Sequence, residues 1–164
     1  MAEIHFTQKG FLFTSDPDDM KPDQIHQWLS TRSYWAQEIT PQKVEESMKH
    51  SFCIGILNQD QQIGFGRLVT DYSVFAYLAD IFVLEEYQGQ GLGKILIQSM
   101  LDLPWMKSLR KIMLATLDAQ SFYQNLGFSP LLIPDRYMEI NRSELKKPPL
   151  VQKESAEDRP EPKA

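Results

Sequence analysis

The fold is decided by Ile81-Phe82-Val83-Leu84-Glu85-Glu86-Tyr87-Gln88-Gly89-Gln90-Gly91-Leu92-Gly93-Lys94, an apolar segment that leads into a glycine-rich turn. Apolar residues at helical spacing follow this turn as far as Leu101. Glycines let backbone N–H groups approach an anion closely, and the first turn of a helix offers unpaired N–H groups and a partial positive charge. Lys94 adds a full positive charge. The stretch therefore predicts a buried strand, a phosphate-binding turn at 88–94 and an amphipathic helix.

Two common phosphate-binding motifs do not fit this turn. The nucleoside-triphosphate loop needs a glycine where Gln88 stands and a Ser or Thr where Ile95 stands. The dinucleotide fingerprint needs Gly-x-Gly-x-x-Gly, whereas Gly89, Gly91 and Gly93 alternate with single residues. The turn is therefore predicted to bind a different phosphate-bearing ligand.

Strand-like and helix-like patterns alternate along the rest of the chain. The predicted strands are 4–14 (broken at Lys9-Gly10), 52–57, 62–69, 75–84, 111–116 and a last strand at 136–141. The predicted helices begin at Pro22, at Pro41 after the N-cap Thr40, at Leu92, and at Asp118, the last ending near Leu126 before Gly127. Together these elements predict an α/β (α+β) fold, in which helices pack on a mixed sheet.

Composition narrows the class of protein. The net charge of −5 makes a nucleic-acid partner unexpected. No segment approaches the ~20 apolar residues that cross a bilayer, and the N-terminus lacks a signal-peptide pattern. The single Cys53 permits no intrachain disulfide, which fits a cytoplasmic protein. We predict one domain over 1–142 and a charged, proline-rich peripheral or disordered tail over 143–164.

Two motifs resemble the GNAT superfamily of N-acetyltransferases. The first is the Gln/Arg-x-x-Gly-x-Gly pattern of Gln88-Gly89-Gln90-Gly91-Leu92-Gly93, preceded by Tyr77-Leu78-Ala79-Asp80-Ile81-Phe82-Val83. The second is Asp118-Ala119-Gln120-Ser121-Phe122-Tyr123-Gln124-Asn125-Leu126-Gly127-Phe128, which is similar to the family's helix ending in Tyr-x-x-x-Gly-Phe. The order of elements from about residue 5 to 141 is compatible with that family.

The resemblance implies an open, mostly antiparallel sheet whose two central strands splay apart around acetyl-coenzyme A. It places the pyrophosphate on the amides of Gln88, Gly89, Gln90, Gly91, Leu92, Gly93 and Lys94, and the pantetheine arm along Ile81, Phe82 and Val83. An amide near Phe82 or Val83 would stabilise the oxyanion. Tyr123 would contact the donor and protonate the departing thiolate. Asp118 matches a residue that contacts the pantetheine arm and is equally suited to cap a helix.

The general base is left open by the sequence. Some diamine-acetylating relatives have Glu-Asp where this chain has Ala79-Asp80, so the glutamate that they use as base is missing. Asp80 is a candidate for a base or amine-binding role, and equally for a carboxylate paired inside the sheet. A water chain, or an amine that arrives neutral, would dispense with a side-chain base. His5, His26 and His50 have no recognisable partner motif, and no metal is expected.

The acceptor is expected opposite the donor, against aromatic and acidic side chains that suit a cationic amine. The candidates for this wall are Trp28, Tyr34, Trp35, Asp71, Tyr72 and Phe75. The prediction is transfer of the acetyl group of acetyl-coenzyme A to a primary amine of a small molecule or peptide. The alternatives are a non-catalytic sensor of coenzyme A thioesters and an acyltransferase for longer chains. The family often pairs, so a homodimer is also open.

Overall fold

The computed structural model describes residues 3–142, so the predicted tail at 143–164 lies outside the described residues. Contacts divide the chain into two units, Met1–Ser129 and Pro130–Ala164. The first unit holds the sheet and its helices. In the second, the described residues form a short 3-10 helix at Pro134–Arg136.

A six-stranded sheet forms the centre of the first unit, with its strands side by side in sequence order. Every neighbouring pair is antiparallel except β5–β6, which is parallel. This architecture confirms the predicted mixed, mostly antiparallel sheet. The strands are β1 (His5–Gln8), β2 (Phe11–Thr14), β3 (Phe52–Asn58), β4 (Gln61–Thr70), β5 (Phe75–Val83) and β6 (Lys111–Met113).

Two tight turns close the hairpins at the places that the sequence indicated. Lys9 (φ 55°) and Gly10 (φ 84°) join β1 to β2. Gln59 (φ 53°) lies in the turn from β3 to β4. Positive φ at such positions matches the twist of two-residue hairpin loops. Lys9 is an unusual choice there, because its side chain gives no local help to a left-handed backbone.

Within residues 3–142, four α-helices accompany the sheet, and two of them begin with proline at the first helical position. Proline fits there because its missing N–H would have no partner in any case. Thr40 caps the second helix by accepting a hydrogen bond from the Lys43 amide, as predicted. The helices are α1 (Pro22–Arg32), α2 (Pro41–Lys49), α3 (Leu92–Leu101) and α4 (Gln120–Gln124), with 3-10 turns at Pro17–Asp19, Glu85–Tyr87 and Met106–Ser108.

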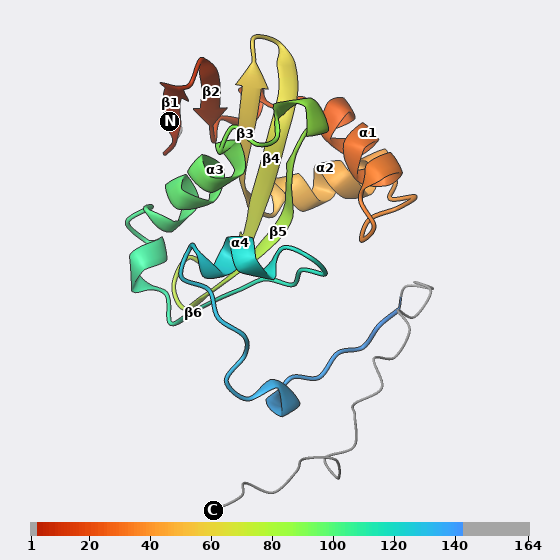
Figure 1. The fold of residues 1–164 in the computed structure, drawn as a ribbon. Coiled ribbons are helices and arrows are strands. Elements are labelled where there is room, and N and C mark those ends of the chain that lie inside the picture. The colour runs from red at the N-terminus through yellow and green to blue at the C-terminus, as the bar shows by residue number, and fades with distance from the viewer. Residues whose placement is uncertain (1–2, 143–164) are drawn as a thin grey trace, which may run out of the picture. The chain divides into compact units, whose positions relative to one another are not determined.

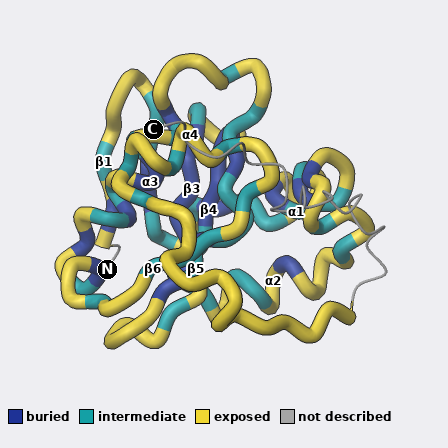
Figure 2. The backbone as a smooth tube through the Cα atoms, turned by 60° about the horizontal axis from the view of Figure 1, so that its bottom comes forward, coloured by how far each residue is buried: buried dark blue, intermediate teal, exposed yellow. Residues whose placement is uncertain are grey.

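The helices cover both faces of the sheet and so create two apolar cores. Figure 1 shows α3 on one side of β3–β5 and α1 and α2 on the other. The buried positions concentrate along β3, β4 and α3 (Figure 2). The core under α3 includes Ile54, Ile56, Leu68, Leu78, Leu92, Leu96, Ile97 and Met100. The core under α1 and α2 includes Ile25, Leu29, Val44, Phe65 and Phe82.

The structure corrects two expected boundaries and one expected strand. β6 ends at Met113 rather than at residue 116, because the chain then departs from β5. α4 begins at Gln120 with Ala119 as its N-cap, so Asp118 does not cap the helix, and Thr116 Oγ1 accepts the Ala119 N–H there. The predicted strand at 136–141 is wrong: residues 137–142 have no regular structure. Met138 and Ile140 are 98% and 81% exposed, so no apolar burial stabilises a strand.

No helix among residues 3–142 is long and apolar enough to cross a membrane.

Candidate active site

A β-bulge at Asp80 shapes the middle of β5. Phe65 of β4 pairs with Phe82 and Arg67 pairs with Ala79, so Gly66 alone faces both Asp80 and Ile81. Asp80 takes φ 55°, a left-handed conformation that aspartate tolerates better than most residues. A Cβ on Gly66 would lie 2.5 Å from Ile81 Cδ1, so glycine leaves the room that the bulge needs.

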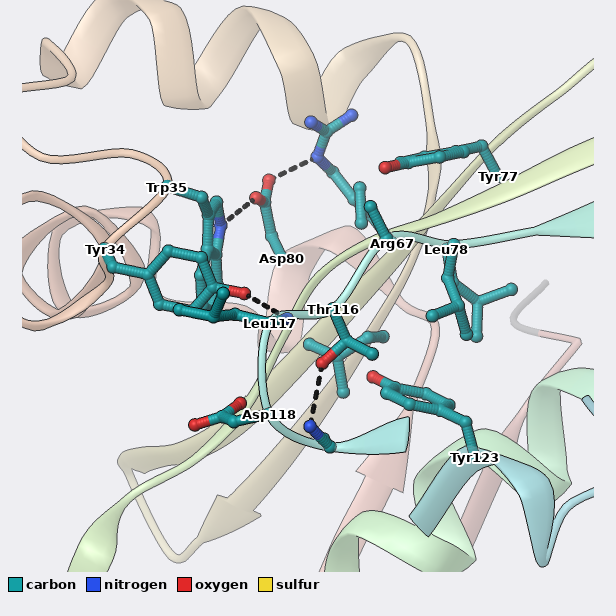
Figure 3. Close-up of a pocket in the computed structure, with 15 residues that line it drawn as sticks. Tyr34, Trp35, Arg67, Tyr77, Leu78, Asp80, Thr116, Leu117, Asp118 and Tyr123 are labelled. Atoms are coloured by element: carbon teal, nitrogen blue, oxygen red, sulfur yellow. Dashed lines mark hydrogen bonds and ion pairs between the residues drawn. The ribbon is translucent and has the colours of Figure 1, made fainter. Parts of the chain in front are cut away.

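The bulge changes the face of the sheet to which the side chains after it point. Leu78 and Phe82 are four residues apart and would share a face in a regular strand. Instead Leu78 packs in the core under α3, whereas Phe82 packs in the core under α1 and α2. The Asp80 side chain then points toward the loop between these two helices, where Trp35 lies (Figure 3). Simple alternation could not predict this direction.

A cavity of about 560 Å³ opens where β5 and β6 separate. The two strands pair only over Phe75–Tyr77 and Lys111–Met113. Beyond those pairs, β5 and the segment after β6 form two walls, and the α1–α2 loop and α4 supply the rest (Figure 3). The lining residues are Tyr34, Trp35, Arg67, Tyr77, Leu78, Ala79, Asp80, Ile81, Leu114, Ala115, Thr116, Leu117, Asp118, Ala119 and Tyr123. The predicted splay is therefore present, but it lies between β5 and the edge strand β6 and not between two central strands.

Both carboxylate oxygens of Asp80 are engaged. Oδ2 accepts from Arg67 Nε at 2.5 Å, and Oδ1 accepts from Trp35 Nε1 at 2.9 Å. The Asp80 and Arg67 side chains are only 10% and 19% exposed. Arg67 also donates to Ser51 Oγ at 3.1 Å. A largely buried ion pair of this kind satisfies two charges that would be costly to desolvate separately.

Tyr123 projects from α4 into the same cavity (Figure 3). Burial, with a smaller contribution from Tyr34, raises the pKa of its hydroxyl to about 12. The phenol is therefore protonated throughout the neutral range and can act only as a proton donor at first. Within the described part of the chain, no group hydrogen-bonds to its hydroxyl, which leaves Oη for a ligand. Its ring packs against Phe122 and Phe128.

The α1–α2 loop reaches across the cavity to the segment after β6. The Leu117 amide donates to the Tyr34 hydroxyl at 3.0 Å. The Tyr34 and Trp35 rings meet edge to face with centroids 4.9 Å apart. This contact fixes the aromatic wall opposite Tyr123. Asp118 lies on the same segment and is exposed.

The glycine-rich turn after β5 has the backbone of an anion-binding site. Gly89 and Gly91 take φ 75° and 78°, values that a Cβ would oppose. Gly91 is the N-cap of α3 and provides no side-chain hydrogen bond. The first intrahelical bond runs from the Ile95 N–H to the Gly91 carbonyl. The first-turn N–H groups of α3 therefore lack helical acceptors, and residues 88–91 are exposed.

Lys9 brings a second cation to this turn from 81 positions earlier in the chain. Its Nζ donates to the Gln90 carbonyl at 2.6 Å. It also lies 3.7 Å from where a Cβ on Gly91 would stand. The side chain of Lys94, by contrast, lines a separate cavity of about 610 Å³ between β1 and α3.

Along the end of β5, successive backbone N–H groups point alternately toward β4 and toward the opposite side, which β6 no longer covers. The Leu84 N–H donates to Ile63 of β4 at 2.8 Å. Because the N–H direction alternates along a strand, the Phe82 N–H also faces β4. The Val83 N–H then faces the side that β6 has left, and the Val83 carbonyl accepts from Gln88 Nε2 at 2.9 Å. Of the two amides considered from sequence, only that of Val83 points away from β4.

Residues 22–128 match the model of the acetyltransferase (GNAT) family. This range contains the bulge, the cavity, the glycine-rich turn and Tyr123. The chain belongs to the GNAT acetyltransferase family. Membership implies acetyl-coenzyme A as the acetyl donor, and the turn's free amides and positive-φ glycines fit its phosphates.

Similar proteins are named as acetyltransferases. The structure of a "putative acetyltransferase belonging to the gnat family" from Xanthomonas campestris is 35% identical with a TM-score of 0.79, and the match covers 82% of this chain and 95% of that one. A "putative acetyltransferase" of Gibberella zeae is 27% identical over 75% of this chain and 81% of its own length. Thialysine N-epsilon-acetyltransferase of Bos taurus is 34% identical over 42% of this chain and only 45% of its own length.

The structure brings only two of the six candidate acceptor residues, Tyr34 and Trp35, to the cavity of this GNAT domain. Trp28 instead stacks on Phe82 with ring centroids 4.1 Å apart, as part of the core. The other three lie at the β4–β5 turn and the start of β5, outside the lining. There Asp71 Oδ1 accepts from the amides of residues 73, 74 and 75, Tyr72 packs on Trp105, and Phe75 pairs with Lys111.

Two residues of the site were missed by sequence reasoning. Arg67 stands in a strand that is buried on both faces, where it pairs with Ala79. Only the folded structure shows its hydrogen bond to Asp80 in the bulge. Lys9 had one local signal, since a lysine at a two-residue hairpin turn is unusual where Asn or Gly is preferred. That signal indicates a constraint on the side chain without naming its partner.

Proposed function

We propose that this GNAT domain transfers the acetyl group of acetyl-coenzyme A directly to a primary amine of a small molecule or peptide. The observation that carries the proposal is a protonated tyrosine, Tyr123, inside the cavity where β5 and β6 separate. The cavity is bounded by β5, and the same strand leads on to the glycine-rich turn. Donor and acceptor would then meet at one point, which supplies much of the rate acceleration.

The donor would be held mainly by backbone. The amides of Gly89, Gln90, Gly91, Leu92, Gly93 and Lys94 would bind the pyrophosphate, with Lys9 as an added cation. The Gln88 N–H, expected to join them, instead donates to the Glu85 carbonyl at 3.2 Å. The backbone of Ile81, Phe82 and Val83 and the side chain of Asp118 would contact the pantetheine arm. The thioester supplies the activated acetyl group.

Two protein groups would assist the transfer, one at the carbonyl oxygen and one at the sulfur. The Val83 N–H faces the open side and would stabilise the developing oxyanion. Tyr123 would protonate the departing sulfur, which its raised pKa permits at every physiological pH. A base role for Asp80 stays a prediction, and its two occupied oxygens favour a positioning role.

Release of coenzyme A thiol tests this function directly. Purified chain, acetyl-coenzyme A and a panel of primary amines should release thiol faster than chain and donor without an amine. Mass spectrometry of the amine should show the addition of one acetyl group. A panel that stays inert while coenzyme A binds tightly would contradict the proposal.

The second candidate is a sensor of coenzyme A or its thioesters that does not turn over. The engagement of Asp80 by Arg67 and Trp35 favours it, because both oxygens of this carboxylate already accept hydrogen bonds. The same titration and thiol assays distinguish the two functions. A cytoplasmic location and a homodimer stay predictions, testable by fractionation and by light scattering.

A further inference from the structure

We infer that the acceptor is a weakly basic amine that is partly neutral near pH 7, such as a peptide α-amine, rather than an alkylammonium such as a lysine side chain. This inference rests on the proposed function and deepens it by naming the class of acceptor. It follows from the contacts of the charged groups that line the cavity and from the protons that the reaction must move.

The buried carboxylate in the cavity is already committed to two donors. Asp80 accepts from Arg67 and from Trp35, one bond to each oxygen. To take a proton from an ammonium, it would have to give up the ion pair and leave the Arg67 charge uncompensated and only 19% exposed. Removing one partner of such a pair is costly. Asp80 therefore positions Trp35 and Arg67 and is a poor base.

The other titratable groups around Asp80 do not replace it. Tyr123 carries its proton, and Tyr34 and Tyr77 are further phenols of the lining. Burial raises the pKa of the neighbouring Cys53 thiol to about 12, so it also stays protonated. Asp118 is exposed, and Figure 3 shows its carboxylate directed away from Tyr123. No histidine lines the cavity within residues 3–142.

The charges of the cavity give an ammonium no strong attraction. The Arg67 guanidinium neutralises Asp80 at hydrogen-bond distance. Apart from Thr116 and the exposed Asp118, the remaining wall is aromatic and aliphatic, with Tyr34, Trp35 and Leu114 among its members. A neutral amine loses less hydration than an ammonium on entering such a site.

With a neutral amine, Tyr123 alone can both supply the proton that sulfur needs and take back the proton that nitrogen loses. The amine nitrogen bonds to the thioester carbon, the C–S bond breaks, and Tyr123 gives its proton to sulfur. The nitrogen then carries one surplus proton, which returns to the Tyr123 oxygen directly or through water. Neutral amine and thioester thus give amide and thiol, and the tyrosine is restored. An ammonium brings one proton more and needs a base.

The experiment compares two short peptides of the same aromatic composition as acceptors of the full chain. One has only a free α-amine, and the other has a blocked N-terminus and one lysine. At pH 7 about a tenth or more of an α-amine is neutral, against roughly one in 2,500 lysine side chains. The α-amine peptide should show a kcat/KM about 200-fold higher. For the lysine peptide, kcat/KM should rise about tenfold per pH unit from 7 to 9.

Variants of the ion pair decide the role of Asp80. Asp80→Asn, and the double variant Arg67→Gln with Asp80→Asn that leaves no unpaired charge, should raise KM for the amine and keep the same pH slope. The exposed turn residue Asp60 provides the matched control Asp60→Asn. If Asp80 were a general base, the unchanged chain would acetylate the lysine peptide without a pH slope between 7 and 9, and Asp80→Asn would lower kcat about 100-fold or more; this pair of results would overturn the inference.

Failure of this inference is distinguishable from failure of the proposed function. Equal use of both peptides at pH 7, or a preference for lysine, contradicts the inference and leaves the acetyltransferase function intact. Bound coenzyme A without thiol release from either peptide or from the amine panel contradicts the proposed function, and the inference with it.

Discussion

The glycine-rich turn and the bulge at Asp80 lie a few residues apart on the same stretch of chain, yet the turn offers backbone groups to a ligand and the bulge offers side chains. The turn is exposed and uses the backbone: positive-φ glycines and uncapped N–H groups at the start of α3. The bulge is half buried and uses side chains from three elements, namely Trp35, Arg67 and Asp80. Backbone groups suit the phosphates of the donor, which do not change from one acceptor to another. Side chains can differ between proteins that use different acceptors.

The largest expected effect tests the chemistry that joins the two regions. Tyr123→Phe removes the proton donor and keeps the ring between Phe122 and Phe128. We expect kcat to fall about 100-fold or more, while coenzyme A binds with nearly unchanged affinity. Stopped assays of thiol release and calorimetry measure the two quantities. Tyr87→Phe, which loses a hydroxyl bonded to Asn58 and Gln61, is the control and should keep kcat.

The next effect tests whether the turn acts through its backbone. Gly91→Ala forces a Cβ into φ 78°, at a cost of about 1–2 kcal/mol. Relief of this strain moves the amides, so coenzyme A affinity should fall roughly tenfold. Gly127→Ala carries a similar strain at φ 94°, with no atom within 4 Å of the new Cβ. If both variants lose the same small stability but neither loses affinity, the turn does not bind the donor.

A smaller effect is expected on the acceptor side. Trp35→Phe removes the 2.9 Å hydrogen bond to Asp80 and keeps an aromatic ring near Tyr34. One hydrogen bond to a partly exposed donor contributes about 1 kcal/mol, so KM for the amine should rise about fivefold. Coenzyme A affinity should not change. A variant that weakens coenzyme A binding instead would show that the two regions are not separable.

The smallest effect tests the added cation of the turn. Lys9→Gln should weaken coenzyme A binding about twofold to threefold at low ionic strength, because Lys9 is exposed and its charge is screened. The difference should vanish in 0.5 M salt. Lys49→Gln on α2 is the matched control and should leave binding unchanged at either ionic strength. An effect of Lys9→Gln that persists in high salt contradicts a purely electrostatic role.

The two regions also differ in how far sequence predicts them. The turn is contiguous, and its glycine spacing together with the helix that follows was sufficient to predict a phosphate site. Asp80 was identified as a residue, but its direction was not, because one unpaired residue in β5 reverses the strand's phase. Arg67 and Lys9 depend on register and on a contact 81 positions apart, which no local pattern contains. The predicted strand at 136–141 was wrong because alternation without burial does not stabilise a strand.

A calorimetric titration of the full chain with coenzyme A and, separately, with pantetheine tests the central claim most directly. Pantetheine has the thiol arm and lacks the phosphates. The account predicts saturable binding of one coenzyme A per chain and binding of pantetheine at least 100-fold weaker. No heat with well-folded protein, or equal affinity for the two ligands, would contradict a phosphate site at residues 88–94.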